Sequence, residues 1–176
     1  MKIGIVGPSG SGKTFLAEEL SEKYKIKHTN LDYVFFNHIV DKSRVELPEK
    51  EWKEKLGKLL EEDNWIIEGV NPLIDVFNKA DNIIYLRPSL FQSLFSQWKR
   101  YFTNPKQRKE HGFINNTKLT KYLLRQYLQE PDQKEYKNPK YSRVRKTDQI
   151  TSKYKSKLII FTSRKEVNAF IRKPHL

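Results

Sequence analysis

The sequence predicts an α/β domain in which a parallel β-sheet is covered by helices on both faces. Short apolar runs alternate with segments of helical periodicity along the 176 residues. The apolar runs are continuous rather than alternating, as expected for strands that are buried on both faces of a sheet. The length fits one domain with a sizeable core.

In the first half of the chain, each apolar run is followed by a helix. Strands are predicted at 2–6, 26–31, 65–67 and 82–86, and the second and third lead into Asp32 and Glu68. Helices are predicted at 13–24, 48–62 and 72–79, with Pro48 in a first turn. Residues 33–47 are predicted to be a loop.

The second half begins with a helix predicted at 88–102. Its apolar residues recur at helical spacing and are predicted to face the core: Leu90, Leu94, Phe95, Trp98 and Phe102. Residues 103–116 contain helix breakers and are predicted to be a mobile loop before a helix from Thr117, its expected cap, to Gln129. A strand at 158–161 and a helix capped by Ser163 complete the domain, with 103–156 as a basic insert.

Composition narrows the class of protein. The absence of cysteine excludes disulfides and thiolate metal sites. No apolar run approaches the ~20 residues of a membrane helix. The apolar stretch in the start MKIGIVG is too short for a secretory signal peptide. A protein of the cytoplasm with no membrane partner is therefore expected.

Charge is distributed unevenly along the chain, whose net charge is +13. Residues 1–90 carry 13 Lys and Arg against 15 Asp and Glu, which leaves 21 against 6 in residues 91–176. Such a basic half attracts polyanions, which could be nucleotides, nucleic acid or an anionic membrane. The alternative is a lysine-rich surface that is only solvated.

The segment GPSGSGKT matches the pattern G-x-x-x-x-G-K-[ST] between a predicted strand and a predicted helix. Glycines allow the backbone to turn its N–H groups toward phosphate oxygens, and the following helix N-terminus adds partial positive charge. Lys13 is predicted to reach the β- and γ-phosphates and Thr14 to bind Mg²⁺. Since no guanine-reading NKxD motif is present, ATP is favoured, bound by Gly7, Pro8, Ser9, Gly10, Ser11, Gly12, Lys13 and Thr14.

Three charged residues follow predicted strands, where ligands bind in open parallel sheets. Asp32 is predicted to be a catalytic base for an acceptor hydroxyl, or to hold a metal-bound water. Glu68 is predicted to hold the water shell of Mg²⁺. Arg87 either contacts a substrate phosphate or pairs with Asp81 or another acid.

With these motifs in order, the chain resembles the small P-loop kinases, which include adenylate, shikimate and nucleoside kinases. The segments WIIEG and NIIYLRPS are similar to the motifs of their third and fourth strands. GPSGSGKT, HTNLD, WIIEG, ADNIIYL and the final SRKE together resemble the DNA topology modulation proteins. Residues 1–100 carry the resemblance well, 157–172 fairly and 103–156 weakly.

The resemblance implies a P-loop NTPase fold with three α/β/α layers, a five-stranded parallel sheet in the order 2-3-1-4-5, and a helical lid. Arg100 corresponds to the arginine at the entry of the lid, and Arg108 is expected to close over the γ-phosphate. Arg143 and Arg145 are further lid candidates. Ser163 and Arg164, with Thr162, correspond to the loop that holds the adenine base.

These observations lead to one main functional hypothesis and two alternatives. The main one is Mg-ATP-dependent transfer of the γ-phosphate to a nucleoside or nucleoside monophosphate, with Lys13, Asp32, Arg100 and Arg108 as catalytic residues. One alternative is a nucleic-acid-associated ATPase that uses the basic half. The other is a degenerate kinase that binds ATP as a regulator. The oligomeric state is left open.

Overall fold

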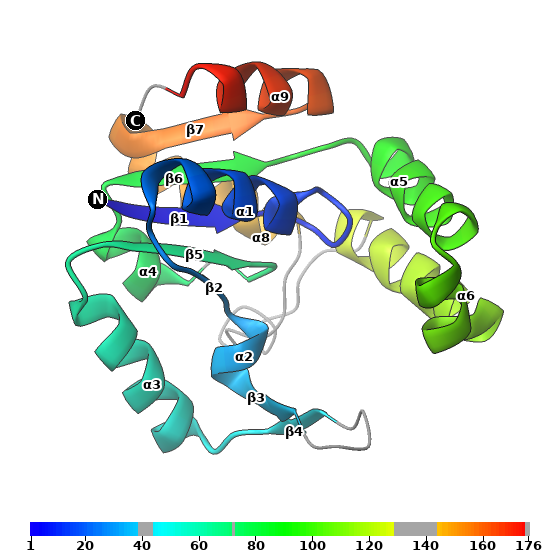
Figure 1. Ribbon diagram of the computed structural model, residues 1–176, viewed down its shortest axis with the longest axis horizontal. Coiled ribbons are helices and arrows are strands. Elements are labelled where there is room, and N and C mark those ends of the chain that lie inside the picture. The colour runs from blue at the N-terminus through cyan, green and yellow to red at the C-terminus, as the bar shows by residue number, and fades with distance from the viewer. Residues whose placement is uncertain (39–43, 72, 129–143, 175–176) are drawn as a thin grey trace.

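The computed structural model describes residues 1–38, 44–71, 73–128 and 144–174, without the side chains of residues 38, 44 and 106–112. Five parallel strands form one sheet in the spatial order β2-β5-β1-β6-β7. Counted within this sheet in chain order, the arrangement is 2-3-1-4-5, as expected (Figure 1). The strands are β1 (Lys2–Val6), β2 (His28–Asn30), β5 (Trp65–Gly69), β6 (Asn82–Leu86) and β7 (Leu158–Phe161).

Alternate residues of each central strand enter two separate cores, because successive side chains point to opposite faces of a sheet. Ile3, Ile5 and Ile66 pack under α1 (Lys13–Tyr24) and α9 (Arg164–Arg172). Val6 and Ile67 face the other way, onto a core that includes α3 (Glu49–Glu61), α4 (Ile74–Lys79) and part of the 3₁₀ segment η1 (Ser152–Lys157). The three predicted layers are present.

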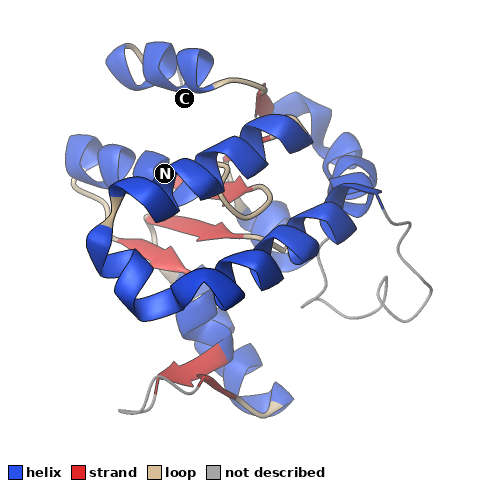
Figure 2. Cartoon of the chain, turned by 90° about the vertical axis from the view of Figure 1, so that its right-hand side faces the viewer, coloured by secondary structure: helices blue, strands red, loops and turns tan. Residues whose placement is uncertain are grey.

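Two long helices extend from the carboxyl end of β6. Helix α5 (Leu90–Thr103) is followed after Asn104 by α6 (Pro105–Leu128), and the two lie side by side (Figure 2). Ser89 caps α5 in a reciprocal capping box with Gln92. Helix α8 (Val144–Thr151) then leads into η1.

The prediction of a loop at 103–116 is wrong, because α6 begins at Pro105. A proline fits the first turn of a helix, where its missing N–H has no partner in any case, and Lys, Gln, Arg and Glu favour helix. Thr117 is therefore inside α6 rather than its cap, and its hydroxyl donates to the carbonyl of Phe113 (2.9 Å).

The face that α5 buries also differs from the prediction. Ser93 and Gln97 are its buried residues, whereas Phe95 and Phe102 are exposed. The helix packs beside α6 through polar side chains, so its aromatic stripe is turned outward. Apolar spacing alone indicated the correct helix but the wrong inner face.

Residues 33–47 hold more structure than the predicted loop. Asp32 opens a short helix, α2 (Asp32–Phe35), and does not end a strand. An antiparallel pair follows, formed by β3 (Phe36–His38) and β4 (Arg44–Glu46). Phe35 and Leu47 from this region enter the core with Trp52, which explains why the segment is ordered where it adjoins the sheet.

Candidate functional site

The glycine loop lies between β1 and α1 at the carboxyl edge of the sheet. Gly10 and Gly12 have φ angles of 78° and 93°, in the left-handed region that favours glycine. A Cβ at Gly7 would lie 2.4 Å from the carbonyl oxygen of Leu86, so this position has no space for a side chain. The loop therefore needs its glycines for backbone shape and for close packing.

The loop ends in a helix start without a side-chain cap. Gly12 is the N-cap of α1, and no side chain accepts a hydrogen bond there. The first N–H groups of a helix have no partner within it, so they are available to an anion. The buried hydroxyl of Ser11 likewise has no hydrogen-bond partner among the described residues.

Lys13 is folded back onto the loop. Its ammonium donates to the carbonyl oxygen of Pro8 (2.9 Å), and the side chain is buried. Burial lowers the pKa of Lys13 to about 8, although the carboxylates of Glu68 and Asp32 act in the opposite direction. Arg100 lowers this pKa further. A phosphate at the loop would supply the counter-charge that favours the protonated amine.

A buried carboxylate lies beside Lys13 at the end of β5. Glu68 is 1% exposed, and its Oε1 accepts hydrogen bonds from the hydroxyl of Thr14 (3.0 Å) and the amide of Asn30 (2.6 Å). Asn30 also accepts the backbone N–H of Asp32 through its Oδ1 (2.8 Å). These contacts bring the ends of β2, β5 and the glycine loop into one polar cluster.

Two cavities flank the glycine loop. One, of about 490 Å³, is lined by residues of the loop, α1, α5 and the start of α9. The other, of about 410 Å³, is lined by the loop, the ends of β2 and β5, α5 and α6. Gly10 and Arg100 line both cavities, so the loop and α5 form the partition between them.

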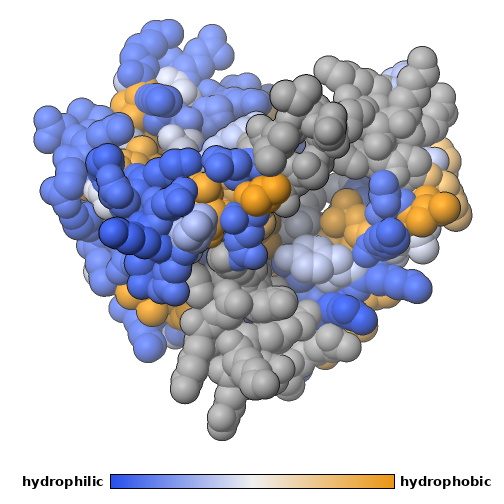
Figure 3. Space-filling model, turned by 90° about the horizontal axis from the view of Figure 1, so that it is seen from below, coloured by the Kyte–Doolittle hydropathy of each residue, from blue (hydrophilic) through white to orange (hydrophobic). Residues whose placement is uncertain are grey.

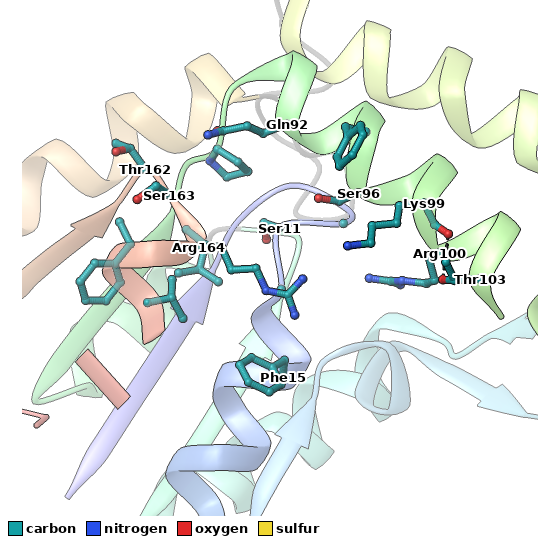
Figure 4. Close-up of a pocket in the computed structure, with 17 residues that line it drawn as sticks. Ser11, Phe15, Gln92, Ser96, Lys99, Arg100, Thr103, Thr162, Ser163 and Arg164 are labelled. Carbon is teal, nitrogen blue, oxygen red and sulfur yellow. Dashed lines mark hydrogen bonds between the residues drawn. The ribbon is translucent and has the colours of Figure 1, made fainter. Parts of the chain in front are cut away.

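The larger cavity combines aromatic and basic walls. Lys99 and Arg100 extend from α5 on one side, and Arg164 extends from the start of α9 on the other, near Phe15 (Figure 4). The guanidinium of Arg164 lies 5.7 Å from the centre of the Phe15 ring. Ser163 lines the same cavity and caps α9 in a capping box with Glu166, as predicted for its cap role.

The smaller cavity contains the acidic candidates. Asp32, Glu68, Lys13 and Thr14 line it together, which brings four of the predicted residues to one place. Its outer wall is built from Gln97 of α5 and from α6, whose contributions are Leu119 and Leu123.

Four of the predicted arginines lie elsewhere or are incompletely described. Arg87 forms a bidentate ion pair with Asp148 of α8 (2.8 and 2.9 Å) and lines neither cavity, so the structure favours pairing. Arg108 belongs to α6, but its side chain is outside the described part. Arg143 lies outside the described residues, and the exposed Arg145 is the second residue of α8 and lines neither cavity.

Several lining residues were not predicted from the sequence. Phe15 and Lys99 line the larger cavity, and Gln97 lines the smaller one. Asn30, two residues before Asp32 in HTNLD, had a usable signal, since a polar residue at a strand end lies at the ligand edge. The others depend on the packing of helices, which spacing along one helix does not give.

In the part of the chain that the structure describes, no three His, Cys, Asp or Glu side chains cluster in a way that could hold a metal ion. No described helix combines the length and apolar character needed to cross a bilayer.

Comparison with known proteins establishes the fold. A shikimate kinase from Acinetobacter baumannii in complex with shikimate superposes with a TM-score of 0.50 and 16% identity, over 98% of this chain and 89% of the other. A gluconokinase from Sinorhizobium meliloti 1021 gives a TM-score of 0.52 and 13% identity, over 97% and 87%. The chain thus has the fold of the small P-loop kinases.

Sequence comparison gives a shorter match. An adenylate kinase of Clostridium kluyveri is 36% identical over 63 residues, which are 36% of this chain and 29% of that protein. The chain therefore matches less than a third of the length of this curated relative. No protein-family model matches the chain. The narrower resemblance to DNA topology modulation proteins stays a prediction.

Proposed function

We propose that this protein transfers the γ-phosphate of Mg-ATP to a small acceptor, a nucleoside or a nucleoside monophosphate. The observation that carries the proposal is the pair of cavities on either side of one phosphate loop, with Arg100 lining both. A donor in the larger cavity and an acceptor in the smaller one would meet at the loop. Catalysis of phosphoryl transfer consists largely of such positioning and of charge stabilisation.

In this proposal the nucleotide base occupies the larger cavity and its phosphates lie on the loop. Phe15 and Arg164 offer an aromatic face and a planar cation near one end, which suits a nucleobase. Backbone N–H groups of the loop and the uncapped start of α1 hold the phosphates. Lys13 and Arg100 stabilise the charge on the transferring group, and Arg108 is proposed as a further lid residue.

The polar cluster fits a magnesium ion in its chemistry. Thr14, Glu68, Asn30 and Asp32 present oxygen atoms, the ligands that Mg²⁺ prefers, and Glu68 is a buried carboxylate beside an exposed threonine hydroxyl. Thr14 would bind the ion and Glu68 would hold its water. When bound, Mg²⁺ would neutralise part of the negative charge of the phosphates.

Asp32 is proposed to act on the acceptor in the smaller cavity. An acceptor hydroxyl oxygen attacks the γ-phosphorus while the bond to the β-phosphate oxygen breaks. The hydroxyl proton passes to the Asp32 carboxylate, and ADP leaves. For a monophosphate acceptor, which already carries negative oxygens, Asp32 would orient the acceptor instead.

The test is ADP release from Mg-ATP by the purified protein against nucleosides, nucleoside monophosphates and small hydroxy acids. Lys13→Met removes the ammonium, and Lys23→Met makes the same change on the exposed side of α1. We expect turnover that depends on the acceptor, is lost in K13M and is retained in K23M. ATP binding without turnover for any acceptor would support the degenerate-kinase alternative.

A second candidate, a nucleic-acid-associated ATPase, is favoured by one observation. Residues 90–128 carry eight Lys and Arg against one Glu, and Phe91, Phe95, Phe102 and Phe113 are 61–76% exposed. Figure 3 shows hydrophobic side chains at its right-hand edge, the side on which α5 and α6 lie. Exposed rings among cations suit the bases and phosphates of a single strand.

Salt separates this candidate from the first. Single-stranded DNA that stimulates ATP hydrolysis at 50 mM salt, and loses most of that effect by 200 mM, would favour the ATPase. Phe102→Ala should then weaken DNA binding, whereas an unchanged affinity would count against this surface.

A further inference from the structure

A hydrogen-bonded bridge joins α6 to the start of α5. The hydroxyl of Tyr127 donates to the carbonyl oxygen of Pro88 (2.8 Å) and lies 2.7 Å from the hydroxyl oxygen of Ser93. A carbonyl only accepts, so the single tyrosine proton is committed to Pro88 and Ser93 donates to Tyr127. The ordinary pKa of a tyrosine already lies well above neutral pH, and burial raises the pKa of Tyr127 further, so the hydroxyl is protonated at neutral pH.

Ser93 is also the point at which α5 adjoins the phosphate loop. It is completely buried, and its carbonyl oxygen lies 3.5 Å from where a Cβ would stand on Gly10. A bulkier loop or a tilted α5 would disturb this packing. The Tyr127 bridge therefore holds α5 at the place where it adjoins the loop.

Arg100 follows Ser93 by seven residues on the same helix. At 1.5 Å per residue this is about 10 Å along the axis, so a tilt of about 10° at Ser93 would move Arg100 by roughly 2 Å. A displacement of about 1 Å at a reacting centre can cost about 100-fold in rate. A small tilt of α5 at the bridge would therefore produce a larger displacement of Arg100 between the two cavities.

We propose that Tyr127 is a positioning residue, which holds α5 against the phosphate loop through Pro88 and Ser93 so that Arg100 is aimed at the junction of the two cavities. This inference rests on the proposed function for its kinetic effect. Its geometric content, the restraint of α5, is independent of any activity.

The experiment compares Tyr127→Phe with Tyr122→Phe, which removes a hydroxyl from the same helix outside the bridge, where Gln126 donates to it (3.1 Å). Trp98 of α5 is half-buried, whereas Trp52 and Trp65 are buried in the core, so acrylamide quenching of tryptophan fluorescence reports mainly on α5. Each variant is measured with and without a non-hydrolysable ATP analogue, and its kcat and KM are determined where turnover exists.

We expect Y127F to raise the quenching of Trp98 and to lower kcat about tenfold, with KM for ATP changed less than threefold and Y122F like wild type. Ser93→Ala should act in the same direction, and the double variant should be no worse than Y127F, because the two share one bridge. Ser93→Ala also serves as the second variant if Y127F does not fold.

Wild-type quenching and kcat in Y127F would overturn the proposal. The proposal would also be overturned if Y122F had the same effects as Y127F. A lower melting temperature of Y127F, together with a lower kcat and a higher KM, would overturn it as well, because a general loss of stability would then explain the kinetics. If the wild-type protein transfers no phosphate, the quenching comparison alone decides, which separates failure of this inference from failure of the proposed function.

Discussion

At the scale of single residues, Lys13 carries a charge that the folded chain does not favour. Its ammonium is buried against a backbone carbonyl, and its pKa falls from 10.5 to about 8. A residue adapted to stability alone would not be charged here. In the proposed function, phosphate oxygens of the nucleotide replace the water that Lys13 has lost.

This pKa predicts how ATP affinity depends on pH. Binding needs the protonated amine, so affinity should be constant below about pH 8 and fall about tenfold per pH unit above it. Calorimetry between pH 7 and 9.5 would measure this dependence. K13M should bind weakly with no break near pH 8, and a break retained in K13M would assign the effect to another group.

The same buried charge of Lys13 should lower the free energy of unfolding. Because the folded pKa of Lys13 lies below the unfolded value, the charge destabilises the fold fully below about pH 8, and stability recovers between about 8 and 10.5. K13M should therefore be more stable than wild type by about 1–3 kcal/mol at pH 7. Denaturant unfolding at pH 7 and 10.5 tests this, and an equal or lower stability of K13M at pH 7 would contradict it.

At the scale of elements, the strand–loop–helix unit around the phosphates was predictable because its signals are local. GPSGSGKT fixes a turn between an apolar run and a helix, and the strands predicted at 2–6 and 82–86 have the observed bounds. Glu68 lies in β5 and Asp32 lies two residues after the end of β2, and both line the smaller cavity because parallel strands bring their carboxyl ends to one edge.

The α5–α6 pair was not predictable in the same way. The choice of inner face depends on partners that are distant in sequence, and here Gln97 donates to the carbonyl (2.7 Å) and side chain (3.0 Å) of Asn116. This buried polar contact leaves no mark on the spacing of the aromatic residues of α5. The spacing therefore predicted that the aromatic face would be buried, whereas the face with Gln97 is buried. The lining residues Gln97, Leu119 and Leu123 depend on this packing.

The close approach of β1 to β6 predicts a contrast between two glycines. Gly7→Ala would drive a methyl group into the backbone carbonyl of Leu86, which cannot rotate away, and should destabilise the fold by about 1–3 kcal/mol. Gly57→Ala lies in α3 with nothing within 4 Å and should stabilise by about 0.5–1 kcal/mol. Thermal unfolding of both variants tests the contrast, which fails if G7A melts at or above wild type.

At the scale of the whole molecule, the basic second half works against compactness. The second half has an excess of 15 positive charges, whereas the charge of the first half is nearly balanced. Moderate salt should therefore raise the melting temperature by a few degrees between 20 and 200 mM NaCl, since screening weakens self-repulsion.

The control for this prediction replaces two exposed lysines of α6. Lys118→Glu with Lys121→Glu lowers the net charge by four and should reduce the dependence on salt. Differential scanning calorimetry at each ionic strength measures both proteins. A melting temperature that falls with salt in wild type would mean that favourable ion pairs outweigh the repulsion.

One helix, α5, forms a wall of both cavities. In the proposed function, a ligand that selects one tilt of this helix would also select the shape of the neighbouring cavity, and the two occupants would then be linked in free energy. The linkage is reciprocal: whatever factor the donor nucleotide applies to the affinity of the acceptor, the acceptor applies to the nucleotide. With this shared wall, the order of filling changes the path but not the total free energy of the ternary complex.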